Sequence, residues 1–265
     1  MGFGWGIFGA SFATVLAQLI AFLLCLRSLR RLPFVQLTKA DWKTDPAILL
    51  HLCRLGIPTG LQMSMITLGG MVLQSVLNGF GVVFVAGYTA ANKLYGILES
   101  ASVAFGYAMT AYMGQNRGAR NAARIDAGIR AVLVLSAEFT AAIVTAMLLA
   151  GKPLLGLFLS TEEAGAADAL AVAYQYLMVL MAFLFALFML QAYRSSLQGL
   201  GEMTVPTLSG FAEMLMRMGA ALVLPTFIGQ SGVFFAEGAA WVCAAALNLV
   251  WYYMQIGKIK RDMLK

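Results

Sequence analysis

The sequence predicts an all-α protein, a polytopic bundle of about seven transmembrane helices. Hydrophobic residues make up 61% of the 265 residues, charged residues make up only 11%, and the mean hydropathy is +0.81. Soluble domains are about 45–50% apolar and about 25% charged. Because a soluble fold of this size could not shield so much apolar surface from water, we expect lipid to surround part of the chain.

Long apolar runs define the individual helices. A helix needs about 20 mostly apolar residues to span a bilayer, whereas barrel strands are about 10 residues long and alternate in polarity. The runs in this chain are long, apolar on all sides and interrupted by small residues, which let helices pack closely in lipid. The seven candidate spans are Phe3–Leu26, Ile57–Phe80, Val82–Met113, Ala127–Ala150, Ala166–Tyr193, Val205–Ile228 and Val233–Ile256.

Basic residues cluster in every second connection, and this predicts the orientation. Lys and Arg are enriched in cytoplasmic loops, so we expect a cell (inner or plasma) membrane protein with a cytoplasmic C-terminus and an external N-terminus. The opposite side carries Lys152 with Glu162, Glu163 and Asp168. The basic clusters are Arg27, Arg30, Arg31, Lys39, Lys43 and Arg54; Arg117, Arg120, Arg124 and Arg130; Arg194; and Lys258, Lys260, Arg261 and Lys265.

The start of the chain suggests truncation. An external N-terminus that enters an apolar run at Phe3, with no leader to deliver it, is unusual. An odd number of spans is also unusual for a transporter built from repeats. Both features are explained if the chain is part of a longer protein.

The residues that build most enzyme sites are scarce. Cys25, Cys53 and Cys243 stand at unrelated spacings in or beside apolar segments, and His51 is alone. We interpret the cysteines as reduced and apolar in character. The sequence has no metal-ligand spacing, nucleophile motif or Walker loop, and no basic-aromatic module for nucleic acid. We therefore expect no enzymatic activity, no cofactor, no bound metal and no nucleic-acid partner.

Two helices carry polar stripes at helical spacing. Such a stripe lines a water-filled cavity that binds a solute, or it forms hydrogen bonds between packed helices; the sequence leaves both alternatives open. Gly70 belongs to the first stripe. The substrate-cavity candidates are Gln62, Gln74 and Asn78 in the second span and Tyr88, Asn92 and Tyr95 in the third.

Carboxylates at membrane depth are the candidates for ion coupling. Glu99 continues the stripe of the third span, four residues after Tyr95. It lies near the middle of that span, where a low dielectric disfavours the charged form and makes proton exchange available. Glu138, inside the fourth span, is the second candidate. Glu213 and Arg217 are four residues apart, which predicts an ion pair within one helix. Glu237, near the external end, is expected to be hydrated.

Several stretches of the sequence are distinctive: Arg54–Gln62, Val85–Leu94, Gly114–Ala119 followed by Arg124-Ile125, and Leu197–Glu202 followed by Pro206. They resemble the multidrug and toxic compound extrusion (MATE) family of the multidrug, oligosaccharidyl-lipid and polysaccharide exporter superfamily. Their order and spacing are similar to spans seven to eleven of that family, and Gly4-Trp5-Gly6 is similar to the sixth. The element Gly114-Gln115-Asn116-Arg117-Gly118-Ala119 is the most specific.

The resemblance implies a fold of two six-helix lobes around a cavity that opens to either side in turn. This chain would be one six-helix lobe plus the last helix of the other. The expected parts are that last helix (1–26), a basic cytoplasmic loop between the lobes (27–54), the C-lobe (55–257) and a cytoplasmic tail (258–265). The implied partners are membrane lipid and a missing N-terminal lobe.

The implied activity is export of small organic, often cationic, compounds in exchange for Na⁺ or H⁺. Some members bind the cation through carboxylates in their seventh and tenth spans. Here Ile57–Phe80 contains no Asp or Glu, and the matching tenth span has only Asp168 at its external edge. The alternatives are a flippase for lipid-linked oligosaccharides, which favours a more basic cavity (Lys93 and Arg217), and a fragment or subunit that does not transport.

Overall fold

A computed structural model describes residues 5–31, 43–159 and 165–263, and the chain divides into two compact units, Met1–Leu52 and Cys53–Lys265. The sequence-based predictions for Lys39, Glu162, Glu163 and Lys265 lie outside the described residues. The division falls close to the boundary at residue 54 that the resemblance implies, and the assignment of the two parts to two lobes stays a prediction.

The first unit contains helix α1 (Gly6–Leu29) and the first turns of α2 (Pro46–Leu77). The predicted loop over 27–54 is too long, because α2 begins at Pro46. Proline suits the first turn of a helix, because the N–H groups there have no acceptor within the helix and the N–H that proline lacks is not needed. The Asp45 carboxylate caps the same turn by accepting from the Ala47 N–H at 2.8 Å. Pro58 consequently lies inside α2 and not near its start.

The second unit is built from long helices. Each predicted span of this unit lies within one helix or within a helix and its adjoining 3₁₀ turn. Six helices of the described residues are both long enough and apolar enough to cross a membrane. Helix α3 is long enough as well, but it contains Asn92, Lys93 and Glu99 and is less apolar than those six. The elements are the rest of α2, η3 (Asn78–Phe80), α3 (Val82–Gly118), α4 (Ala122–Gly156), α5 (Ala166–Gly199), α6 (Thr204–Ile228), η4 (Gln230–Phe234) and α7 (Phe235–Met263).

Helix α5 is the central element, packed against α3, α4 and α7. The crossing with α3 is close because glycines stand at both ends of it. Gly87 of α3 lies against the Ala169 carbonyl, and Gly199 of α5 lies against the backbone of Thr110. Large side chains fill the space between these points, and Tyr176 and Phe188 of α5 are fully buried.

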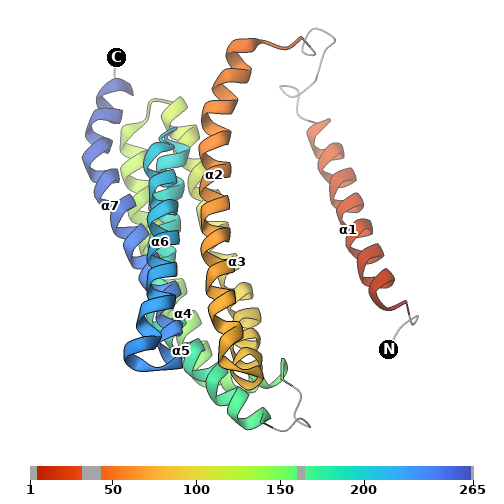
Figure 1. Cartoon of the computed structure of the whole chain (residues 1–265). Helices are drawn as coiled ribbons and strands as arrows, with labels where there is room; N and C mark the ends of the chain where they lie inside the picture. Colours follow the sequence, from red (N-terminus) through yellow and green to blue (C-terminus); the bar gives the residue numbers. More distant parts are fainter. Residues whose placement is uncertain (1–4, 32–42, 160–164, 264–265) are drawn as a thin grey trace. The chain divides into compact units, whose positions relative to one another are not determined.

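One end of the second unit gathers the cations that were predicted to share a side. Asn121 caps α4 by accepting from the Arg124 N–H at 3.1 Å. The Lys260 ammonium lies 2.5 Å from the Asp126 carboxylate, which places the end of α7 beside the turn between α3 and α4 (Figure 1). Arg117 lies against Gly201, after α5. Arg117, Arg124 and Lys260 therefore lie at one end of this unit, as predicted, and which end faces the cytoplasm stays a prediction.

Candidate functional site

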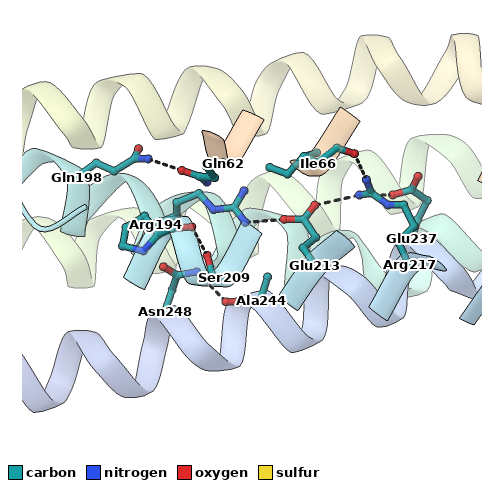
Figure 2. Close-up of polar contacts among 11 residues, drawn as sticks. Gln62, Ile66, Arg194, Gln198, Ser209, Glu213, Arg217, Glu237, Ala244 and Asn248 are labelled. Atoms are coloured by element: carbon teal, nitrogen blue, oxygen red, sulfur yellow. Dashed lines mark hydrogen bonds and ion pairs between the residues drawn. The ribbon is translucent and has the colours of Figure 1, made fainter. Parts of the chain in front are cut away.

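Four charged side chains from three helices form a buried chain of alternating sign, which we call the charge network. Arg194 of α5 donates to Glu213 of α6 (Nη2 to Oε2, 2.5 Å), and Arg217 of α6 donates to the other oxygen of Glu213 at 2.9 Å. Arg217 Nη2 also lies 2.8 Å from Oε2 of Glu237 in α7. Figure 2 shows the four side chains in one continuous row. The network therefore links α5, α6 and α7 through ion pairs.

Close packing of α2 against α6 brings a fifth partner to the network. At Gly69 of α2 an added Cβ atom would lie 3.3 Å from the Cα of Met214, closer than an ordinary contact, so the two backbones approach closely there. At this short separation the Arg217 Nη1 group donates to the Ile66 carbonyl of α2 at 3.0 Å (Figure 2). Arg217 therefore contacts α2 and α7 from its position on α6.

Burial makes the network energetically sensitive. The side chains of Arg194, Glu213 and Arg217 are 4–7% exposed, and that of Glu237 is 16% exposed. Removing one partner of such a pair leaves an uncompensated charge in a low dielectric and costs about 3–5 kcal/mol. Within the described residues, the Nε atoms of Arg194 and Arg217 have no hydrogen-bond partner. Both guanidiniums thus retain an unused donor inside the bundle.

A cavity of about 260 Å³ lies beside the charge network. Its wall contains three carboxylates and two guanidiniums, so it carries one excess negative charge when all five are ionised. Glu99 of α3 interacts with the Tyr95 hydroxyl and lies in the field of Arg217. The cavity can accept one positive charge. Its lining residues are Ile66, Asn92, Tyr95, Glu99, Leu187, Leu190, Gln191, Arg194, Glu213, Arg217, Glu237 and Trp241.

Three of the predicted site residues, Asn92, Tyr95 and Glu99, line this cavity. All three come from the predicted stripe of α3. Tyr95 is buried and stacks on Trp241 of α7, with ring centroids 5.5 Å apart. The fourth member of the stripe, Tyr88, is not among the lining residues. Its hydroxyl accepts from that of Tyr176 of α5 at 3.2 Å. Tyr88 therefore forms a hydrogen bond between packed helices, the second of the two alternatives that the sequence left open.

The stripe predicted on α2 is divided between two environments. Gln62 is buried and accepts from Gln198 of α5 at 3.0 Å, again the interhelical alternative. Gln74 and Asn78 are exposed and bond to each other at 3.1 Å. Glu138 is exposed on α4 and is not among the residues lining the cavity. The structure therefore brings Glu99 to the charge network and leaves Glu138 apart from it.

Sequence reasoning missed two members of the network. Arg194 was assigned to a loop, which is wrong: α5 continues to Gly199 and buries the guanidinium. The glycines at 199 and 201 are the helix-end signal that would have extended the helix. Glu237 was expected to be hydrated, but it pairs with Arg217. The predicted pair of Glu213 and Arg217 is confirmed.

Comparison with known proteins gives consistent matches. Residues 58–223 match the MatE family. The chain is 29% identical over 257 residues to "Probable multidrug resistance protein YpnP" of Bacillus subtilis (strain 168), which covers 94% of this chain and 55% of that protein. "Probable multidrug resistance protein YoeA" of the same strain is 26% identical over 267 residues, covering 98% and 56%. The chain thus spans about half the length of these curated relatives.

Solved structures share the fold. A MOP superfamily transporter from Pyrococcus furiosus superposes with a TM-score of 0.87 at 23% identity, covering 97% of this chain and 58% of that one. An outward-facing multidrug resistance MATE family transporter gives a TM-score of 0.86 at 22% identity, with the same coverage. At this identity the likeness establishes the helical architecture alone.

Proposed function

The chain belongs to the MatE family, and from this premise we propose that it is part of a secondary active antiporter that exports small organic cations in exchange for Na⁺ or H⁺. We place it in a cell membrane with its C-terminus in the cytoplasm. The relatives are about twice as long, so the transport path would be completed by a second lobe. A non-transporting subunit remains the alternative for the chain by itself.

The excess carboxylate in the cavity carries this proposal. Ion pairs hold Glu213 and Glu237, whereas Glu99 forms no ion pair within residues 5–31, 43–159 and 165–263. A carboxylate that is free to take up a proton, a metal cation or an organic ammonium is what an exchange mechanism needs, because competing cations then bind in turn. We assign this role to Glu99, with Asn92 and Tyr95 as neighbouring polar contacts.

The charges of the cavity argue against the flippase alternative. A lipid-linked pyrophosphate requires unpaired cations, and the guanidiniums of Arg194 and Arg217 are both engaged by carboxylates. Lys93 is exposed and does not line the cavity. The site therefore suits a cation better than an anionic headgroup.

Binding of a fluorescent cationic dye to the purified full chain in detergent tests the proposal. We expect Na⁺ or protons to weaken dye binding by competition, and Glu99→Gln to abolish both the competition and most of the binding. Glu138→Gln is the matched control, because it removes an exposed carboxylate away from the cavity. Unchanged binding and competition in Glu99→Gln would exclude the role of Glu99.

Export is tested separately in cells that carry the chain alone or together with the first lobe of a relative. Dye efflux that depends on Na⁺ or pH only when both lobes are present supports a partial transporter. Efflux by neither combination, in cells where both lobes reach the membrane, would contradict the proposal.

A further inference from the structure

A second cavity, an apolar groove, lies between α3 and α4. Its volume is about 550 Å³, within the range of about 300–1,000 Å³ typical of ligand pockets. The side chains that line it are almost all hydrocarbon. They are Ala104, Phe105, Ala108, Met109 and Tyr112 of α3 and Ala127, Gly128, Ala131, Val132 and Leu135 of α4. We call this cavity the α3–α4 groove.

Small residues open the groove, and a tyrosine closes one end of it. Ala108 and Ala131 lie on facing helices and leave space that longer side chains would fill. The Tyr112 ring packs directly on Gly128, where an added Cβ atom would lie 2.2 Å from the ring, and the Tyr112 hydroxyl donates to the Arg124 carbonyl at 2.9 Å. The groove therefore ends beside the first turn of α4, which carries Arg124 and follows Arg120 in the sequence.

Arg124 lies on the same face of α4 as the groove. Gly128, Ala131 and Leu135 follow it by four, seven and eleven residues, which are helical repeats of one face. The side chains of Arg120 and Arg124 are exposed, and neither forms an ion pair in the described part of the chain. Nearby Lys260 differs, because Asp126 neutralises it.

We propose that the α3–α4 groove binds an anionic phospholipid. One acyl chain lies between Ala108 and Ala131, and the phosphate accepts hydrogen bonds from Arg124 and Arg120. Guanidinium groups bind phosphate through paired hydrogen bonds, and basic sites between membrane helices bind anionic headgroups. The apolar wall and the free cations at its end together match a molecule that is hydrocarbon along its length and anionic at its head.

A helix from another protein is the competing occupant of an apolar groove. Such a helix would cover the hydrocarbon wall but would leave Arg120 and Arg124 without partners unless it carried a carboxylate at one position. A phospholipid satisfies both features with its ordinary chemistry, so the lipid is the occupant that the charges favour.

Lipid titration of the purified full chain tests the site without reference to transport. Phosphatidylglycerol and phosphatidylcholine with identical acyl chains are added in non-ionic detergent, and native mass spectrometry counts the bound lipids. We expect tighter binding of phosphatidylglycerol, and about a fivefold loss of that affinity in Arg124→Gln, the size expected for one cation near a lipid headgroup. Lys258→Gln is the charge control, since Lys258 is exposed at the same end but on α7.

A second pair of variants tests the acyl chain. Ala131→Phe fills the groove and should reduce phosphatidylglycerol binding at least as much as Arg124→Gln does. Ala137→Phe adds the same side chain at an exposed position of α4 that does not line the groove, and should bind lipid normally. Equal binding of the two lipids, or binding unaffected by Ala131→Phe, would overturn the proposal, the latter being the result expected if protein covers the groove.

Discussion

The charge network and the C-terminal half of the stripe predicted on α2 (Gln74 and Asn78) both place polar residues in long apolar helices, yet these residues find their partners in different ways. Arg194, Glu213 and Glu237 come from three helices and are held by ion pairs to each other or to Arg217. Gln74 of α2 and Asn78 of the adjoining η3 turn are exposed and bond to each other at 3.1 Å. Helical spacing reveals which residues share a face, whereas neighbouring helices decide whether that face is buried.

The difference has an energetic consequence. A charge inside the bundle depends on partners contributed by other helices, so the loss of one partner leaves a buried charge unpaired and destabilises the bundle. A neutral amide on the surface depends on little beyond its own helix, and its replacement changes few contacts. We therefore expect substitutions in the two regions to differ by several kcal/mol.

The largest effect is expected for Glu213→Gln. Arg194 would lose the carboxylate that it contacts at 2.5 Å, and Arg217 would keep Glu237 as its one carboxylate partner beside the Ile66 carbonyl. The free energy of unfolding should fall by about 3–5 kcal/mol, the cost of a buried charge without its partner. Denaturant unfolding in detergent, followed by circular dichroism, measures the change.

Glu138→Gln is the matched control for that substitution. It makes the same chemical change at an exposed position of α4, and its effect should stay within about 0.5 kcal/mol. Equal stability losses in the two variants would mean that the ion pairs of the network contribute nothing specific.

Two glycines, Gly199 and Gly96, give the same comparison of buried and open positions for packing. A Cβ atom at Gly199 would lie 2.5 Å from the Thr110 carbonyl oxygen and 2.9 Å from the Met113 Cβ, whereas one at Gly96 would meet nothing within 4 Å. Gly199→Ala should therefore destabilise by about 1–3 kcal/mol through overpacking. Gly96→Ala should stabilise by about 0.5–1 kcal/mol, since Ala is the better helix former. Thermal unfolding of the two variants should give shifts of opposite sign, and a stabilising shift for Gly199→Ala would refute the close α3–α5 crossing.

A buried hydroxyl pair should give a smaller effect. Tyr176 donates to Tyr88 at 3.2 Å, and the rings stack with centroids 4.4 Å apart. Tyr176→Phe keeps the stacking and removes one hydrogen bond, so the free energy of unfolding should fall by about 1 kcal/mol. Tyr107→Phe, at a residue that is 70% exposed, is the control and should be neutral. A loss for Tyr107→Phe as large as that for Tyr176→Phe would contradict this assignment.

The sequence predicted the helices well because span length and apolar composition are local properties. It placed all the helices of the second unit, and it put Asn92, Tyr95 and Glu99 on one face. The helix ends were less predictable, since α2 begins at Pro46 and α5 continues to Gly199. The charge network could not be predicted, because Arg194 and Glu237 are paired by the packing of three helices and no sequence spacing encodes that packing.

The smallest effect is expected for Gln74→Leu, which tests what surrounds the C-terminal half of α2. The substitution removes the bond to Asn78 on an exposed face, so the free energy of unfolding should change by less than about 0.5 kcal/mol. Gln62→Leu makes the same change where the amide is buried and accepts from Gln198, and should cost about 1–3 kcal/mol because Gln198 loses its partner. Since both residues were predicted on one polar stripe, similar costs at the two positions would mean that a neighbour covers Gln74 as it covers Gln62.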